Sequence, residues 1–439
     1  MSSFETWRNW AGTETASPKR VVRPRDVQEL SAAVSAAARD GLTVKAVGSG
    51  HSFTGVAVTE GAQIRLDGMD GVVDVDATTG LVTVEAGIPL HRLNPLLESL
   101  GLGMTNLGDI DQQTISGAIS TGTHGTGARY GGIATQVRGL QLVLANGELI
   151  SCSDRENPDL FAAARIGLGA LGVIANVTLQ CEPVFDLHAV EGAMPLDEVL
   201  DKFDELADDN DHFEFYWFPH TQRTFTKRNN RVPRGTPRKP VGPISRWFDD
   251  ELMSNSVFDL TNKLVRRFPR LVPAANNVAA RAWSAREVVD VSYRVFTSPR
   301  RVVFREMEYA VPRAHLREVI RAVQAWIVKT GERISFPIEV RVAAPDDIWL
   351  SSAYDRETAY VAVHQYDQVP YERYFHAVED ICAGVGGRPH WGKLHWLDAT
   401  ELAVRYPRFG DFARIRADVD PDGLFANPYL DRVLGPASP

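Results

Sequence analysis

The sequence predicts an α+β protein with two domains and a C-terminal tail that returns to the first domain. A chain of 439 residues is too long for one ordinary hydrophobic core, so two domains are expected. Up to residue 182, short β-branched segments broken by glycine predict many short strands. Beyond residue 182, aromatic strand-like segments and a long amphipathic helix indicate a domain of different character.

The first domain is predicted to span residues 1–182 and to open with a helix. Apolar residues recur at helical spacing in PRDVQELSAAVSAAARDG, with Asp26 as the cap and Gly41 at the end. Strands and hairpins are predicted in LTVKAVGSG, AQIRLDGM and GVVDVDATTGLVTVEAG. A second helix follows in IPLHRLNPLLESLG, and then a glycine- and threonine-rich loop from Thr105 to Gly132. The domain closes with VRGLQLVLANGELISC as strand, and with a helix, a turn and a strand in NPDLFAAARIGLGALGVIANVTLQC.

The second domain is predicted over residues 183–385. Its strand-like segments are DHFEFYWFPHTQRTFTKRNN, SYRVFTSPRRVVFREMEYAVP, RISFPIEVRVAA and TAYVAVHQYD. The basic, proline-rich RVPRGTPRKPVGPISRW predicts an exposed loop before a helical insert near residues 245–285. An amphipathic helix is expected in RAHLREVIRAVQAWIVKTG. Residues 386–439 are predicted to return and pack on the first domain.

Composition and charge exclude several classes of protein. Hydrophobic residues make up 44% and charged residues 23% of the chain, which is typical of a soluble globular protein. A net charge of −9 argues against nucleic acid as a partner. With no export signal and no apolar run of membrane-spanning length, we expect a cytoplasmic protein without an integral membrane segment. The three widely spaced cysteines indicate reduced thiols, and nothing suggests a structural metal.

Two glycine-rich loops predict an anion site. The first, VGSGHSF, follows a predicted strand and ends in His51; the second is SGAISTGTHGTG, from Ser116 to Gly127. Glycines let consecutive backbone N–H groups converge on a diphosphate without obstruction by side chains. Neither loop has the Walker sequence or the dinucleotide fingerprint that precedes a long helix, which disfavours a Rossmann site.

Charged and aromatic residues of the second domain are candidates for a pocket. Glu339 and Arg341 lie two apart on one predicted strand, so both point to the same face. Taken alone, such a pair is most simply a structural ion pair. His364 alternates with valines and either faces the same cavity or is a satisfied core histidine. Tyr216 and Trp217 are expected in the core of this domain; the alternative is that one of the two rings lines the pocket.

Several motifs, taken in order, resemble one known family. They are VGSGHSF, VTVEAGIPL, TNLGDIDQQTISGAISTGTHGTG, FPIEVR, HWGK and FANPYL. The chain is similar, from about residue 15 to residue 432, to the aldonolactone oxidoreductases, the L-gulonolactone and D-arabinonolactone oxidase group. These belong to the vanillyl-alcohol-oxidase (VAO) class of flavoproteins. The resemblance implies a two-subdomain FAD-binding domain of the PCMH/VAO type, built from the N-terminal part and the return, under a cap of antiparallel sheet and helices.

The resemblance implies that FAD lies on the two glycine loops. His51 matches the histidine that bonds covalently to the flavin 8α-carbon; the alternative is an ordinary loop histidine that donates to phosphate. Gly108 would leave oxygen a path to the flavin, and Lys393 or His395 would supply positive charge near flavin N1 or the C2 carbonyl. His124 is expected to fix backbone or to touch the edge of the flavin ring. The diphosphate cradle would consist of Gly48, Ser49, Gly50, Ser52, Ser116, Gly117, Thr121 and Gly122.

On the substrate side, the resemblance implies that Arg341 and Lys393 stabilise a developing alkoxide while Glu339 binds sugar hydroxyls and orients Arg341. His364 and His390 would line the pocket. The predicted reaction is oxidation of L-gulono- or D-arabinono-1,4-lactone by hydride transfer to flavin N5, with electrons passed to O2 or to a protein or quinone acceptor. Two alternatives stay open: an alditol oxidase acting on xylitol or sorbitol, and a flavin-binding protein that has lost catalysis.

Overall fold

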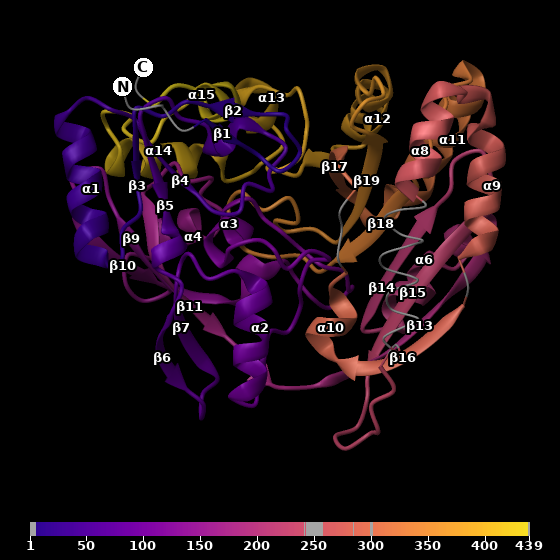
Figure 1. The fold of residues 1–439 in the computed structure, drawn as a ribbon, viewed down its shortest axis with the longest axis horizontal. Coiled ribbons are helices and arrows are strands. Elements are labelled where there is room, and N and C mark those ends of the chain that lie inside the picture. The colour runs from indigo at the N-terminus through magenta and orange to yellow at the C-terminus, as the bar shows by residue number, and fades with distance from the viewer. Residues whose placement is uncertain (1–5, 241, 243–257, 284, 299–301, 438–439) are drawn as a thin grey trace.

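The computed structural model describes residues 6–240, 242, 258–283, 285–298 and 302–437. Figure 1 shows these residues in two lobes, with the N-terminal half and the C-terminal tail together in one and the middle of the chain in the other. Both ends of the chain lie at the same corner of the first lobe. This arrangement confirms an α+β protein with a returning tail.

The first lobe contains two main sheets. A three-stranded parallel sheet has the order β3-β5-β4, and a five-stranded antiparallel sheet has the order β10-β9-β11-β7-β6. The strands are β3 (Arg20–Val22), β4 (Val44–Val47), β5 (Ala62–Arg65), β6 (Val72–Asp76), β7 (Leu81–Glu85), β9 (Val137–Val143), β10 (Leu149–Ser153) and β11 (Val173–Gln180). Two short pairs complete the lobe: β1 (Trp7–Arg8) with β2 (Thr15–Ala16), and β8 (Leu102–Gly103) with β12 (Glu182–Pro183).

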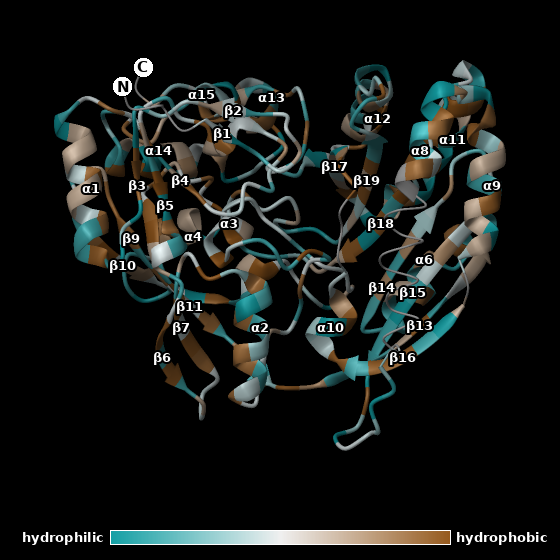
Figure 2. Ribbon diagram, viewed as in Figure 1, coloured by the Kyte–Doolittle hydropathy of each residue, from teal (hydrophilic) through white to brown (hydrophobic). Residues whose placement is uncertain are grey.

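The helices of the first lobe are α1 (Val27–Arg39), α2 (Leu90–Ser99), α3 (Ile115–Ser120) and α4 (Pro158–Ala164). As predicted, Asp26 caps α1, and its side chain accepts a hydrogen bond from the Glu29 amide. The helix buries Leu30, Val34 and Ala37, so its apolar spacing faces the core. Figure 2 shows both hydrophilic and hydrophobic residues along α1, as this one-sided burial requires, and hydrophobic residues along β6 and β7.

The second lobe is built on one eight-stranded antiparallel sheet of order β16-β13-β15-β14-β18-β19-β17-β20. Its strands are β13 (Asp186–Pro195), β14 (His212–Trp217), β15 (Arg223–Arg231), β16 (Arg286–Val291), β17 (Phe304–Pro312), β18 (Ile338–Ala343), β19 (Thr358–Tyr366) and β20 (Arg388–Pro389). Helices accompany the sheet: α5 (Leu196–Asp201), α6 (Phe203–Asp208), α8 (Phe258–Arg267), α9 (Val272–Ala282), α10 (Ser292–Phe296), α11 (Leu316–Thr330) and α12 (Glu372–Gly384).

One prediction for this lobe is wrong, and another lies partly outside the described residues. Ser292–Phe296 was expected as strand but forms the helix α10, because its buried residues Ser292, Val295 and Phe296 recur at helical spacing. The strand proper, β17, begins only at Phe304. Of the predicted loop and helical insert, residues 241, 243–257 and 284 lie outside the described residues.

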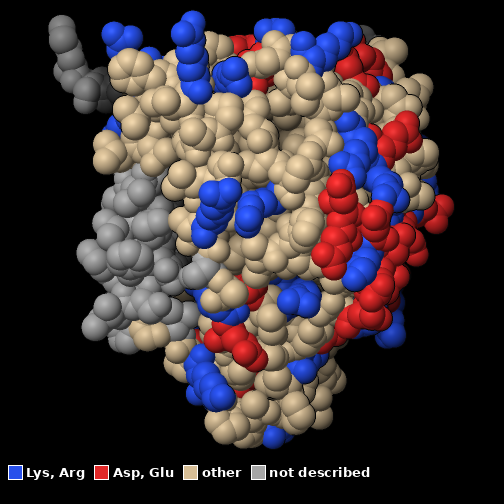
Figure 3. Space-filling view, turned by 90° about the vertical axis from the view of Figure 1, so that its right-hand side faces the viewer, with Lys and Arg blue, Asp and Glu red and all other residues tan. Residues whose placement is uncertain are grey.

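Ion pairs join α11 to α5, and the turn before α11 to α6, on the outer face of the second lobe. Arg313 pairs with Asp204 and Asp208, and Arg321 with Asp197. Figure 3, which faces this side of the molecule, shows a band in which acidic and basic side chains are intermingled rather than gathered by sign. No helix in the described part of the chain has the length and apolar character needed to cross a bilayer.

The tail leaves the second lobe after β20 and packs on the first. It forms α13 (Ala399–Ala403), α14 (Phe409–Val419) and α15 (Pro428–Leu434), which lie beside the N-terminal strands in Figure 1. The Leu424 carbonyl accepts a hydrogen bond from the Val44 amide, so the tail extends the pairing of β4. The Asn427 side chain donates to the carbonyls of Gly55, Val56 and Val58. The tail is therefore held by backbone groups of the first lobe.

Candidate active site

Two adjoining cavities contain most of the predicted site residues. The glycine-loop cavity lies within the first lobe and its walls include Lys45, Gly48, Ser49, Gly50, Ser116 and Gly117. The interlobe cavity lies between the lobes and its walls include Gly108, Glu339, Arg341, His364, His390 and Lys393. Four residues line both cavities: His51, Ser52, Gln113 and Thr121. His51 therefore stands where the two cavities meet.

The glycine-loop cavity keeps its shape because side chains are absent at key points. A Cβ at Gly48 would lie 2.3 Å from the Thr114 Oγ1, and Gly50 has a φ of +69°. Thr114 caps α3 through the Gly117 amide, at 3.3 Å. The Ser116 hydroxyl donates to the Ala86 carbonyl at 2.7 Å and keeps its oxygen free to accept. The loops leave room for an anionic ligand close to the backbone.

His51 is held as a neutral imidazole at the junction. Burial lowers its pKa to about 4, and the positive charge of Lys393 contributes in the same direction. The Trp10 ring stacks on the imidazole with 5.5 Å between centroids and 25° between planes. At neutral pH the ring therefore has a free nitrogen lone pair and a fixed orientation.

Arg341 is surrounded by three carboxylates in the interlobe cavity. Its Nε donates to Glu214 Oε2 at 3.0 Å, its Nη2 pairs with Glu339, and Asp109 Oδ2 lies 3.9 Å away. Glu339 and Arg341 come from β18 and Glu214 comes from the neighbouring β14. These carboxylates hold the plane of the guanidinium fixed. They also keep it charged, because they raise the pKa of Arg341 against the opposing effect of burial.

The sequence analysis omitted two carboxylates around Arg341, Glu214 and Asp109, and it placed Tyr216 in the core with the pocket as the alternative. The Tyr216 hydroxyl, expected in the core, is half-buried and donates to Glu339 Oε1 at 3.1 Å. Trp217 is buried as expected. The period-two alternation of HFEFYW would have placed Glu214 and Tyr216 on one face of the strand. The aromatic composition of that stretch favoured a purely structural interpretation.

A second wall of the interlobe cavity comes from β17. Glu306 forms an ion pair with Lys393, and His364 Nε2 lies 3.4 Å from Glu306 Oε1. Burial alone would raise the pKa of Glu306, but Lys393 and His364 outweigh it and hold that pKa at about 2. His364 Nδ1 lies 3.3 Å from the Pro337 carbonyl. Glu306, which the sequence analysis did not select, therefore positions two of the predicted residues.

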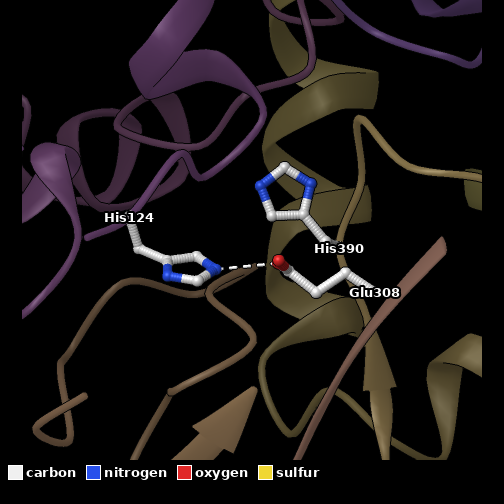
Figure 4. Close-up of side chains that lie close together, drawn as sticks. All are labelled: His124, Glu308 and His390. Atoms are coloured by element: carbon white, nitrogen blue, oxygen red, sulfur yellow. Dashed lines mark hydrogen bonds and ion pairs between the residues drawn. The ribbon is translucent and has the colours of Figure 1, made fainter. Parts of the chain in front are cut away.

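Glu308, two residues along β17, lies between two histidines (Figure 4). His124 Nε2 is 2.8 Å from Glu308 Oε1, and His124 Nδ1 is 2.9 Å from the Gly125 carbonyl. Both imidazole nitrogens face oxygen acceptors, so each is placed to donate a hydrogen bond. His390 Nδ1 accepts a hydrogen bond from the Gly392 amide at 3.1 Å, and burial lowers the His390 pKa to about 4.

This cluster has the spacing of a metal site, because its candidate ligand atoms all lie within 4.8 Å of one another. Its hydrogen bonds nevertheless favour protons over a cation. His124 donates from both nitrogens in this geometry, and a ligand to metal must offer a lone pair. The His124 ring also stacks on Tyr360 with centroids 3.5 Å apart. His124 thus fixes its own loop, as predicted, while lining the interlobe cavity.

Two predicted residues line neither cavity within the described part of the chain. His395 lies behind Lys393, with its Nε2 3.2 Å from the Tyr429 hydroxyl, in contact with the tail. Lys393 lines the interlobe cavity, and the Leu394 amide between the two residues donates to the Glu306 carbonyl. Gly122, with a φ of +79°, ends α3 instead. A place for His395 beside the cofactor stays a prediction.

Comparison with known proteins supports this geometry. A model of the D-arabinono-1,4-lactone oxidase family matches residues 177–433, and an FAD binding domain model matches residues 18–153. The L-gulono-1,4-lactone dehydrogenase of Mycobacterium tuberculosis is 44% identical, covering 98% of this chain and 99% of its own. The L-gulonolactone oxidase of Bos taurus is 35% identical, with 98% of each chain covered.

Solved structures share the fold. The cholesterol oxidase of Brevibacterium sterolicum superposes with a TM-score of 0.83 over 98% of this chain and 96% of its own, at 18% identity. A solvent-stable cholesterol oxidase gives a TM-score of 0.79 over 97% and 96% of the chains, at 21% identity. The likeness confirms the predicted fold of an FAD-binding domain with a cap. By sequence and by fold, this chain belongs to the aldonolactone oxidoreductase family of FAD-binding proteins.

Proposed function

We propose that this chain oxidises a sugar-derived 1,4-lactone, L-gulono- or D-arabinono-1,4-lactone, with FAD as its cofactor. The observation that carries the proposal is the meeting of two cavities at His51, one with glycine-loop walls and one with opposed cations. The names of the relatives, all acting on aldonolactones, favour the lactone over an open-chain alditol. Residues 1–182 and 386–439 would then form the FAD domain, and residues 183–385 the cap.

The chain's own residues fit FAD. The glycine-loop cavity suits the diphosphate, because Gly48 and Gly50 let the loop pack closely against Thr114 and Trp7 while its backbone lines the cavity. The interlobe cavity takes the reactive ring, which when bound accepts the hydrogen and electron pair of the alcohol carbon. His51 joins the two cavities with a neutral, oriented imidazole, and we propose it as the point of covalent attachment.

Arg341 and Lys393 act on the substrate hydroxyl. Both are cations on the walls of the interlobe cavity, held respectively by Glu214 and Glu306. Positive charge beside the hydroxyl oxygen lowers the energy of the alkoxide that forms as the C–H bond breaks. Glu339 binds the remaining sugar hydroxyls, and its hydrogen bond from Tyr216 keeps it in place. The chemistry thus needs a fixed pair of cations and a fixed carboxylate.

Anaerobic mixing of the purified protein with substrate tests this function. We expect L-gulono- or D-arabinono-1,4-lactone to bleach the flavin absorbance faster than xylitol or sorbitol. Replacing Lys393 with methionine should slow the bleaching by about 100-fold or more while FAD stays bound. Faster bleaching by xylitol would assign an alditol oxidase, and no bleaching by any of the four would leave only flavin binding.

Acid precipitation tests the covalent bond separately. Yellow colour in the protein pellet supports attachment through His51, and a His51→Ala variant should release the colour to the supernatant. Colour in the supernatant of the unaltered protein would refute the bond without affecting the proposed reaction.

A further inference from the structure

Lys45 is a buried cation without a counter-ion. It lies on β4 with 2% of its surface exposed, and its Nζ donates to the Gly169 carbonyl at 3.0 Å and the Phe425 carbonyl at 3.2 Å. Among the described residues no carboxylate lies within ion-pair distance of this ammonium. A buried ammonium with only neutral partners is costly, so the site favours an additional anion.

The position of Lys45 indicates where that anion binds. Lys45 and Gly169 both line the glycine-loop cavity, together with Gly48 and Gly50. A Cβ at Gly169 would lie 3.5 Å from the Lys45 Nζ, so the glycine leaves the ammonium uncovered on that side. Two of its three N–H groups have backbone acceptors, and the third is available to a ligand.

The second acceptor of Lys45 belongs to the tail. Phe425 follows Leu424, whose carbonyl pairs with the Val44 amide. Asp420 holds this turn by accepting from the Leu424 and Phe425 amides at 2.7 and 2.9 Å. A ligand that binds the Lys45 ammonium therefore also affects the position of the C-terminal tail, which packs on the first lobe.

We propose that Lys45 binds the anionic diphosphate and adenylate half of FAD and couples its binding to docking of the C-terminal tail. The inference rests on the proposed function, in which FAD occupies the glycine-loop cavity. Without the anion, burial and, to a smaller extent, Arg416 lower the Lys45 pKa to about 7, against the opposing effects of Asp420 and Asp431. A phosphate beside the ammonium raises that pKa, so FAD binding takes up a proton when the solution is above about pH 7.

The test uses the full-length His51→Ala protein, stripped of flavin, so that FAD binds reversibly. FAD and riboflavin, which lacks the diphosphate and adenylate, are titrated into this parent protein. They are also titrated into the same protein with Lys45→Met or Lys45→Arg added. Lys202→Met, an exposed lysine of the second lobe, is the control. Proton uptake is read from calorimetry at about pH 8 in two buffers of different ionisation enthalpy.

We expect Lys45→Met to weaken FAD binding by about 10- to 100-fold and to abolish proton uptake. Riboflavin binding should not change, and Lys45→Arg should restore part of the FAD affinity. FAD should also slow amide exchange in residues 424–434 of the parent protein but not of Lys45→Met.

Several outcomes would overturn the inference. FAD affinity unchanged in Lys45→Met, or an equal loss for riboflavin, would make Lys45 structural. If Lys45→Met does not fold, the parent protein decides, because FAD binding without proton uptake contradicts the proposal. A parent protein that binds neither flavin would instead refute the proposed function itself.

Discussion

At the scale of single residues, the charge on Arg341 depends on neighbours from another strand. Glu214 accepts from the Arg341 Nε, and the two side chains are 7% and 11% exposed, so water does not replace the contact. We predict that Glu214→Gln lowers kcat/KM by about 10- to 100-fold with the flavin content unchanged. Steady-state kinetics on the preferred lactone measures this.

An ion pair of the same sheet, in which the carboxylate is buried and the arginine is exposed, provides the control for Glu214. Glu191 on β13 binds Arg286 through both carboxylate oxygens but lines neither cavity. Glu191→Gln should alter stability and leave kcat/KM within about twofold. If both variants lose activity equally, the effect of Glu214 is on the fold and not on Arg341.

We propose that the space left by Gly108 gives oxygen access to the flavin. A Cβ there would lie 3.0 Å from the Thr123 Cγ2 and 3.4 Å from the His124 carbonyl oxygen. We predict that Gly108→Ala slows reoxidation of the reduced flavin by O2 about tenfold, a barrier change of about 1.4 kcal/mol. Stopped-flow mixing with aerated buffer measures it.

The control is the rate at which a soluble quinone reoxidises Gly108→Ala. The added methyl group should slow O2 more than a quinone, because the quinone accepts electrons at the entrance of the cavity. Equal slowing with O2 and quinone would assign the change to the flavin itself. Bleached flavin that stays bleached under air in the unaltered protein would make the enzyme a dehydrogenase, independently of Gly108.

The sequence predicted three residues of the site but not the carboxylates of β17. Glu339, Arg341 and Lys393 line one cavity, and two of them share one strand face by simple alternation. Glu306 and Glu308 follow the same alternation in FREMEYAVP, yet nothing local distinguishes a pocket-facing carboxylate from an exposed one. Their partners Lys393 and His124 are distant in sequence, so only the fold reveals the ion pairs.

At the scale of elements, β17 holds two carboxylates with different tasks. Glu306 holds Lys393 in the cavity, whereas Glu308 is the carboxylate partner of buried His124. Glu308→Gln removes the carboxylate from this buried pair, so we predict a loss of about 3 to 5 kcal/mol of unfolding free energy. Urea unfolding of the flavin-free protein measures this loss.

Glu306→Gln is the matched variant on the same strand face. It should cost less stability, because Lys393 is 22% exposed and can be hydrated, and it should instead lower kcat/KM. Equal destabilisation by the two variants would contradict the division of tasks along β17.

Elements were predicted most reliably where their periodicity was long. The segment at α11 buries five apolar residues on one face and was identified from that spacing. The short α10 was not, because five residues give no resolvable period and its apolar residues equally suit a strand. The order of the eight-stranded sheet lay beyond any local pattern, since β14 and β18 pair across more than a hundred residues.

At the scale of the whole molecule, buried neutral histidines should make the flavin-free protein acid-sensitive. Burial lowers the pKa of four of them to about 4 or about 3: His51, His212, His390 and His395. An unfolded histidine binds a proton near pH 6.5, so below that pH the unfolded chain holds more protons and stability falls until about pH 4. Asp346, whose pKa burial raises to about 6, offsets part of the loss.

Each such histidine contributes about 1.4 kcal/mol per pH unit within that window. We therefore predict that the unfolding free energy of the flavin-free protein falls steeply from pH 6.5 to pH 4.5, as measured by urea titration at several pH values. His395→Gln should flatten the slope by about one proton. His91→Gln, at an exposed position, should leave it unchanged. Stability that is constant or rises toward pH 4.5 would show that these imidazoles are accessible to protons in the folded protein.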